Sequence, residues 1–253
     1  MPKSCRCARS GQMLVVSSLV IALIMISTSA YVYELAGDFE STDVYPLNDY
    51  MQSVKLGTKN VVVGALANIT QGGQSEMLAA NLDRWRTAIA KHYAVGKLAL
   101  DYLLRETAPY SSGLYIAWGT DGIGVSEAYV DYTLSAKGNR INMENEEHTN
   151  VSSRLCVEGF MTQVSPNASQ VTVTWRLFNE GQAALAENAT LYYGEAGQWL
   201  IPDAAGDCVV TDYGNGTYRA TFVLGSLSSV DVSIYVLDKR DILVQANVTC
   251  VEP

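Results

Sequence analysis

Histidine is nearly absent from this chain of 253 residues, and its scarcity limits the chemistry that the protein can perform. Only His92 and His148 occur, and no His-Glu-x-x-His, Gly-x-Ser-x-Gly or Cys-x-x-Cys pattern is present. A zinc site would therefore need carboxylates from distant parts of the sequence. We assign both histidines structural or surface roles, and we expect no enzymatic activity, no catalytic residue, no metal and no cofactor.

Acidic residues are absent before position 34, whereas Lys3, Arg6 and Arg9 lie in that stretch. Behind this basic leader come 21 uncharged positions, from Met13 to Tyr33. About 20 apolar residues in a helix span the hydrocarbon core of a bilayer. Because cations precede the run and acids such as Glu34 follow it, the N-terminus is expected in the cytoplasm. The sequence therefore predicts a single-pass plasma-membrane protein that contacts the lipid bilayer through a helix at 12–33, with the rest of the chain extracellular.

A second interpretation of the same segment is a cleaved signal peptide. The stretch Met13 to Ile26 is short enough for the apolar core of such a peptide. Small residues at Thr28, Ser29 and Ala30 would then form the cleavage site. In that case the mature protein would begin at Tyr31 and be secreted.

Positive charge is scarce beyond residue 33. That region carries 14 Lys and Arg against 26 Asp and Glu, because three of the 17 cations and none of the acids precede it. The formal charge of −12 disfavours nucleic acid and anionic lipid as partners. It is typical of a solvated, exported protein.

Cysteines divide between the two sides of the predicted membrane helix. Cys5 and Cys7 lie in the basic leader, where acylation is one use of such a pair. Beyond the helix, Cys156, Cys208 and Cys250 are odd in number, so at most one intramolecular disulfide can form among them. We expect Cys156 to pair with Cys250, because they belong to the first and last predicted strands of the C-terminal module. A pairing through Cys208 and three free thiols both stay open.

Six Asn-x-Ser/Thr sequons lie beyond the apolar run and none precedes it. Short motifs of this kind also arise by chance, since Asn and Thr are common in exposed turns. Their placement on the predicted outer side favours glycosylation. The candidate acceptors are Asn68, Asn150, Asn167, Asn188, Asn215 and Asn247.

Two amphipathic helices are predicted after a polar link. Apolar residues recur at spacings of three, four and seven from Leu47, behind Pro46, to about Ala67. Gly72 and Gly73 end that pattern. A second helix is expected from Ser75 to Pro109, with Leu78, Leu82, Trp85, Ile89, Gly96, Leu100 and Leu103 on its buried face. Together they predict a helical stalk over 34–110, folded as a hairpin.

From Gly113 onward the hydrophobic period changes to two. Segments such as LYIAW, AYVDYTLSA, QVTVTWRLF and VDVSIYVL are rich in Val, Ile, Thr and Tyr, and turn formers separate them. We predict a β-hairpin region over 111–151 and an antiparallel β-sandwich over 152–253. The fold class is therefore α+β: an N-terminal membrane helix, a helical hairpin and then an antiparallel immunoglobulin-like sandwich.

The N-terminus resembles that of archaeal type IV pilins, which carry a class III signal. The matching residues are Arg9-Ser10-Gly11, then Gln12 and the apolar run. The resemblance implies a leader over 1–11 and cleavage between Gly11 and Gln12 by a prepilin-type peptidase. Ser10 stands where a basic residue is usual, and Val16 stands where bacterial pilins have Glu, so packing by that Glu is not expected.

The C-terminal region resembles immunoglobulin-like sandwiches of the filamin and invasin sort. The shared element is the turn from Asp212 to Tyr218, DYGNGTY. The resemblance implies a fold used for spacing and binding, with no inherited active site.

Two further patterns have structural interpretations. Asp203, Asp207 and Asp212 are close enough in sequence to bind calcium, but no EF-hand spacing is present and solvated loop carboxylates are the preferred interpretation. The glycines between Gly119 and Gly124 join two predicted strands, so they indicate a tight hairpin and not a dinucleotide-binding loop.

These features predict a non-enzymatic, membrane-anchored cell-surface protein: a pilin-like subunit, or an envelope or adhesion component. Its partners would be further copies or other surface proteins. The alternative is a tethered extracellular sensor or solute-binding module, with a pocket lined by Trp85, Tyr93 and Trp118. An exported hydrolase ranks third, since no nucleophile and base can be named.

Overall fold

The computed structural model describes residues 25–27, 44–92, 97–138, 142–202 and 208–252. They belong to two units, residues 1–53 and 54–253, which are described separately. The predicted leader, the cleavage site at Gly11 and Gln12, and all of the predicted membrane segment except 25–27 lie outside the described residues. None of the helices within the described ranges is both long and apolar enough to cross a bilayer.

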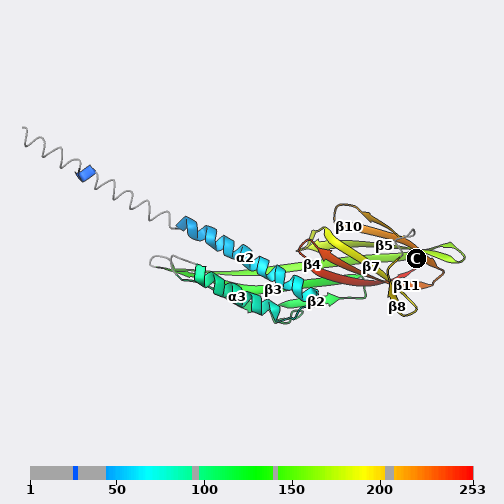
Figure 1. Cartoon of the computed structure of the whole chain (residues 1–253), viewed down its shortest axis with the longest axis horizontal. Coiled ribbons are helices and arrows are strands. Elements are labelled where there is room, and N and C mark those ends of the chain that lie inside the picture. Colours follow the sequence, from blue (N-terminus) through cyan, green and yellow to red (C-terminus); the bar gives the residue numbers. More distant parts are fainter. Residues whose placement is uncertain (1–24, 28–43, 93–96, 139–141, 203–207, 253) are drawn as a thin grey trace, which may run out of the picture. The chain divides into compact units, whose positions relative to one another are not determined.

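Helix α2 spans Val44–Thr70 and helix α3 spans Met77–His92 (Figure 1). The first helix is confirmed, and it ends where the sequence predicts. Gly72 takes a positive φ of 102°, its N–H donates to the carbonyl of Ile69, and the N–H of Gly73 donates to the carbonyl of Asn68. These two bonds form a Schellman motif, which occupies carbonyls that the helix end would leave without partners.

The expected second helix is too long, because α3 stops at His92 and strand β1 (Lys97–Leu104) follows. Leu100 and Leu103 were both predicted on a buried helix face. In the strand Leu100 is fully buried and Leu103 is 71% exposed. The leucines of this stretch fit either period, and pairing of Leu100 with Leu134 on a neighbouring strand selects the period of two.

Twelve strands are described, and all of their pairings are antiparallel. The large sheet has the order β1-β3-β4-β5-β10-β9, with β2 beside β3 and β6 beside β5. The small sheet has the order β12-β11-β7-β8. The remaining bounds in the large sheet are β2 (Leu114–Trp118), β3 (Ile123–Lys137), β4 (Asn142–Ser165), β5 (Ala168–Asn179), β6 (Gln182–Ala183), β9 (Val209–Asp212) and β10 (Thr217–Gly225). Those in the small sheet are β7 (Ala186–Glu195), β8 (Gln198–Leu200), β11 (Ser229–Asp238) and β12 (Leu243–Val251).

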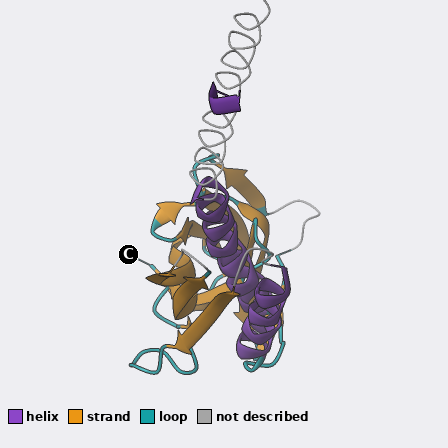
Figure 2. Cartoon of the chain, turned by 90° about the vertical axis from the view of Figure 1, so that its left-hand side faces the viewer, coloured by secondary structure: helices purple, strands orange, loops and turns teal. Residues whose placement is uncertain are grey.

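The ladder between β3 and β4 runs through both parts of the unit formed by residues 54–253. It pairs every residue from Ile123 with Cys156 to Lys137 with Asn142. The helices cover one end of it and the small sheet covers the other (Figures 1 and 2). The predicted division between a hairpin region and a sandwich, at residues 151 and 152, therefore falls inside β4, and no break in the sheet accompanies it.

The helical end has its own hydrophobic core. Val62 and Leu66 of α2 and Leu78 and Leu82 of α3 are fully buried, and they pack with residues of the large sheet such as Val130. The helices also approach each other closely. The Trp85 ring lies against Gly57, where a Cβ atom would come within 2.3 Å of the ring.

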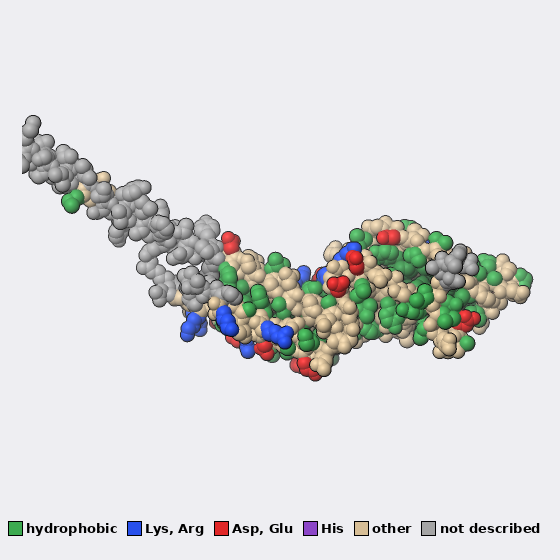
Figure 3. All heavy atoms as spheres, viewed as in Figure 1, with side chains coloured by type: hydrophobic (Ala, Val, Ile, Leu, Met, Phe, Trp, Pro, Cys, Tyr) green, Lys and Arg blue, Asp and Glu red, His purple; other side chains and the backbone are tan. Residues whose placement is uncertain are grey.

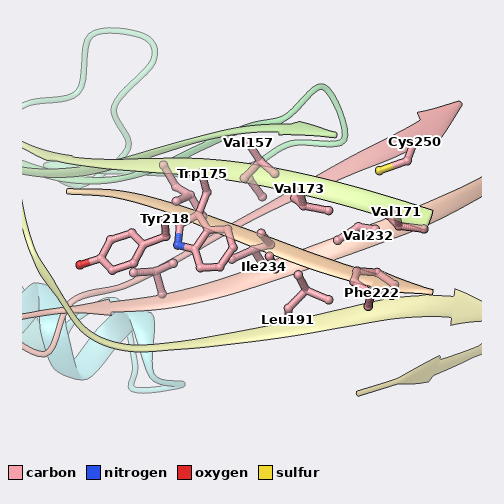
Figure 4. Close-up of a cluster of buried hydrophobic side chains, with 14 of the residues drawn as sticks. Val157, Val171, Val173, Trp175, Leu191, Tyr218, Phe222, Val232, Ile234 and Cys250 are labelled. Carbon is pink, nitrogen blue, oxygen red and sulfur yellow. The ribbon is translucent and has the colours of Figure 1, made fainter. Parts of the chain in front are cut away.

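The sandwich end buries side chains of both sheets (Figure 4). Trp175 and Tyr218 stack with ring centroids 5.6 Å apart. Phe222, farther along β10, is almost fully buried, and its ring lies 5.8 Å from that of Tyr193. Figure 3 shows further hydrophobic side chains on the outer surface of this part. At the β4 side of the core, Gly159 leaves room for the buried Cys250, because a Cβ at Gly159 would lie 2.4 Å from the Cys250 sulfur.

The turn between β11 and β12 connects the two ends. Asp238, fully buried, accepts hydrogen bonds from the backbone N–H groups of Arg240 and Ile242 at 2.8 and 3.0 Å. Its carboxylate also pairs with the Arg240 guanidinium at 2.8 Å, and that guanidinium donates to Glu180 and to the carbonyl of Ser152. One ion-pair network thus ties the small sheet to β4 and to the β5–β6 turn.

The buried carboxylate of Asp238 generates a stability prediction. Asp238→Ala is expected to lower the free energy of unfolding by about 3 kcal/mol or more, because it leaves Arg240 and two backbone N–H groups without their acceptor. Asp101→Ala, at an exposed position of β1, is the control and should cost less than about 0.5 kcal/mol. Urea unfolding of the full chain measures both, and equal effects would contradict the role of the network.

The contact between Gly159 and Cys250 generates a second prediction. Gly159→Ala is expected to cost about 1–3 kcal/mol through overpacking against the sulfur. Adding Cys250→Ala makes room for the new methyl group, so the double variant should lose less stability than the two single losses summed. Gly225→Ala, where an added Cβ meets no atom within 4 Å, is the matched control. Strict additivity in this double-mutant cycle would show that the two sites do not touch.

Candidate functional site

A groove of about 720 Å³ lies on the face of the large sheet that points away from the small sheet. Its floor consists of side chains from β3 and β4. Tyr115 of β2 stands at one side, and Phe178 of β5 with the β5–β6 turn stands at the other. The lining residues are Tyr115, Ile123, Val125, Glu127, Ser152, Arg154, Cys156, Phe178 and Gly181. The floor is mainly apolar, with one carboxylate and one guanidinium, which is typical of a binding groove.

The connection between β1 and β2 covers the Tyr115 side of this groove. The Tyr110 hydroxyl donates to Glu127 at 2.6 Å, and its ring lies 6.2 Å from that of Tyr115. Burial, and then the hydrogen bond to Glu127, raise the pKa of Tyr110 well above its ordinary value, so the phenol stays protonated. Glu127 is therefore held in place by a neutral donor.

An aromatic stack continues from the groove toward the helical end. The Arg105 guanidinium lies 3.5 Å from the centre of the Tyr129 ring, and the His148 ring stacks on Tyr129 with an interplanar angle of 3°. Cation–π and stacking contacts of this kind give a fixed arrangement of side chains at an exposed position. His148 thus has the surface role that we expected, and no metal ligand set forms around it within the described residues.

The six predicted glycosylation sites differ in accessibility. Five acceptors are exposed: Asn68, Asn150, Asn167, Asn188 and Asn215. Asn247 is half-buried on β12, and its Oδ1 accepts hydrogen bonds from Ser233 at 2.5 Å and from Gln245 at 3.2 Å. Asn247 is therefore the least suitable acceptor.

The predicted disulfide between Cys156 and Cys250 does not form, and the three described cysteines are free thiols. Cys156 lies in the groove on the outward face of β4, whereas Cys250 is buried in the core between the sheets. Leu155 and Val157, the neighbours of Cys156 on β4, face the core, so Cys156 points away from the small sheet and cannot reach Cys250 on β12. Burial raises the pKa of Cys250 to about 11, and it also raises the pKa of Cys208.

The tryptophans of the alternative solute pocket have different surroundings. The indole of Trp85 donates to Thr58 at 3.0 Å between the helices, and that of Trp118 donates to Ser126 at 3.1 Å beside the sandwich core. Tyr93 lies outside the described residues. The structure therefore does not bring Trp85 and Trp118 together in one pocket.

The remaining sequence candidates have structural roles where they are described. Gly119 to Gly124 form the predicted hairpin between β2 and β3, and Gly122, with a φ of 78°, donates to the carbonyl of Asn247 on β12. Asp212 accepts from the N–H of Gly214 in the turn before β10. Asp203 and Asp207, the other candidate calcium ligands, lie outside the described residues.

The groove itself escaped the sequence analysis. Its side chains come from four strands and one turn that are far apart in the chain, between Tyr115 and Gly181. Alternation predicts which residues of one strand face outward, yet it does not say which strands are neighbours. The pairing of Glu127 with Ser152, and of Arg154 with Phe178, supplies that information.

Comparison with protein-family models, with curated protein sequences and with solved structures finds no match for this chain. No relative therefore transfers an activity or a ligand to it.

The free thiols generate a prediction about reactivity. In the folded full chain at pH 8, iodoacetamide is expected to label Cys156 well before Cys250, because only about one Cys250 thiol in a thousand is ionised and the side chain is buried. Peptide mass mapping measures the order. In urea without reductant both residues should react equally. If neither reacts there, the two cysteines form the disulfide that the sequence predicts.

Proposed function

We propose that this chain is a non-enzymatic, membrane-anchored cell-surface protein, working as a pilin-like subunit or as an envelope or adhesion component. The observation that carries the proposal is the junction of the basic leader and the 21 uncharged residues from Met13 to Tyr33. It supports a cytoplasmic N-terminus and an extracellular position for residues 54–253.

The strand order supports an immunoglobulin-like sandwich as the exported module. Such domains pair strands A, B, E and D in one sheet and strands G, F and C in the other. Counting the sandwich strands from β4, the large sheet has β4-β5-β10-β9 and the small sheet has β12-β11-β7-β8. This is the same order, with β8 as an added strand beside C. Sandwiches of this kind serve spacing and binding, and any function depends on the surface they present.

The β3–β4 ladder supports a mechanical role. At about 3.3 Å per residue, the 15 residues of β3 that pair with β4 span roughly 50 Å. The helices stiffen one end of this ribbon and the small sheet stiffens the other, so both ends are held by packed cores. A ribbon of this length holds a surface groove in a fixed position relative to the helical end.

The exposure of the sequons is consistent with an extracellular position. Five acceptor asparagines lie at solvent-exposed positions on both parts of the unit formed by residues 54–253. Glycans at such positions would leave the cores undisturbed, whereas Asn247 would have to give up its hydrogen bonds first.

The test is N-terminal sequencing with intact mass on protein from native membranes, together with protease treatment of intact cells. We expect a chain that begins at Gln12 and a sandwich that the protease reaches. A chain that begins at Met1 with an accessible sandwich would retain the anchored surface protein and remove the pilin-like processing. A chain that begins at Tyr31, or a sandwich protected on intact cells, would overturn the proposed topology.

A further inference from the structure

Three arginines form a diagonal row on the outward face of the large sheet. They are Arg154 on β4, Arg176 on β5 and Arg219 on β10. Arg154 pairs with Phe178, two residues from Arg176, and Thr217, two residues from Arg219, pairs with Arg176. Diagonal neighbours on one face of a sheet are about 7–8 Å apart. The three guanidinium groups therefore follow one line across three adjacent strands.

None of these arginines has an acidic partner among the residues that the structure describes. All three are exposed, and none makes an ion pair with any residue in the described ranges. The nearest carboxylates on this face are Glu127, held by Tyr110, and Glu158, which pairs with Thr174 and forms no ion pair with the row. Glu127 and Glu158 are diagonal neighbours of Arg154 and Arg176, so three guanidinium groups face two carboxylates. In a chain of formal net charge −9, the row is thus a local cationic stripe with an excess of one positive charge.

The row begins in the groove and continues over a hydroxyl-rich surface. Arg154 lines the groove, with Phe178 directly opposite it and Tyr115 at the other side. Several threonines lie on this face, among them the buried Thr172, together with apolar residues such as Phe160 and Val223. The threonines are Thr162 on β4, Thr172 and Thr174 on β5, Thr211 on β9, and Thr217 and Thr221 on β10.

We propose that this face binds a linear anionic polysaccharide, with its carboxylate or sulfate groups on Arg154, Arg176 and Arg219 and a sugar ring in the groove. Guanidinium groups bind such anions through paired, charge-assisted hydrogen bonds. Aromatic rings offer an apolar face with a polar edge, which suits a sugar ring, and the threonine hydroxyls match sugar hydroxyls. The inference deepens the surface function proposed above and rests on it for placing this face outside the cell.

The charge distribution favours a thin polymer over other anions. A bilayer surface or a nucleic-acid duplex presents a wide field of negative charge, which the acidic remainder of the protein would repel. A single extended polysaccharide contacts the stripe and little else. The groove adds a reason for sugar, because its floor apart from Arg154 is mainly apolar and suits the face of a sugar ring better than a phosphate backbone.

The test measures binding of heparin and polygalacturonate to the full chain in phosphatidylcholine nanodiscs, with duplex DNA as the comparison polyanion. The variant carries Arg154→Ser, Arg176→Ser and Arg219→Ser. Its matched control, with the same loss of charge, carries Arg84→Ser, Arg86→Ser and Lys91→Ser at exposed positions of α3. Thermal melting establishes whether each variant folds. If the serine variant does not fold, a second variant with Arg154→Lys, Arg176→Lys and Arg219→Lys keeps the charge and takes its place.

We expect the serine variant to bind at least one of the two polysaccharides about tenfold more weakly or worse, with a shallower salt dependence, and the α3 control to bind like the natural chain. The lysine variant should retain part of the affinity. Phe178→Ala should weaken binding and leave the salt dependence unchanged, since it removes a stacking surface and no charge. These results together would establish the site.

Three outcomes would overturn the proposal: no binding of either polysaccharide, equal weakening in the α3 control, or DNA binding as tight as that of the polysaccharides and equally sensitive to the row. Failure of the proposed surface function is seen separately. If the sandwich is protected from protease on intact cells but the protein still binds polysaccharide, the binding site stands and its extracellular location is wrong. If the protease reaches the sandwich but no polysaccharide binds, the location stands and the binding site is wrong.

Discussion

The antiparallel ladder between β3 and β4 is the constraint on which the rest of residues 54–253 depends. Because the ladder has no register shift from Ile123 to Lys137, alternate side chains of both strands stay on the same face of the sheet along its whole length. One face buries apolar side chains along its full length, first against the helices and then against the small sheet. Since each covering layer reaches only part of the ladder, two separate cores form on one sheet, and the opposite face stays free for binding.

Two separate cores on one sheet need a connection, and the turn after β11 supplies it. Asp238 and Arg240 join the small sheet to β4, while the carbonyl of Asp241 accepts a hydrogen bond from Gln71 and the N–H of Leu243 donates to Thr70 at the end of α2. Buried ion pairs add little net stability when complete, yet they are costly when broken. The network therefore specifies one docking geometry for the helical end and the sandwich.

The surface chemistry of the outward face suits binding. The outward face carries a groove, a held carboxylate at Glu127 and a row of arginines, and these groups suit recognition of an extended anionic ligand. Tyr110 holds Glu127 in place through a hydrogen bond, and Arg154 is exposed to solvent.

The sequence by itself determined the strand-rich C-terminal half, the first helix with its end at Gly72 and the hairpin at Gly122, because these depend on local periodicity and turn chemistry. The membrane segment and its orientation stay predictions from the sequence, since they lie almost wholly outside the described residues. Only the tertiary structure decided that Leu100 belongs to a strand, that Cys156 and Cys250 face opposite ways, and which strands are neighbours in each sheet. The groove and the arginine row belong to this second class. Their members lie up to about a hundred residues apart along the chain, and long-range strand pairing, which no local pattern encodes, brings them onto one face.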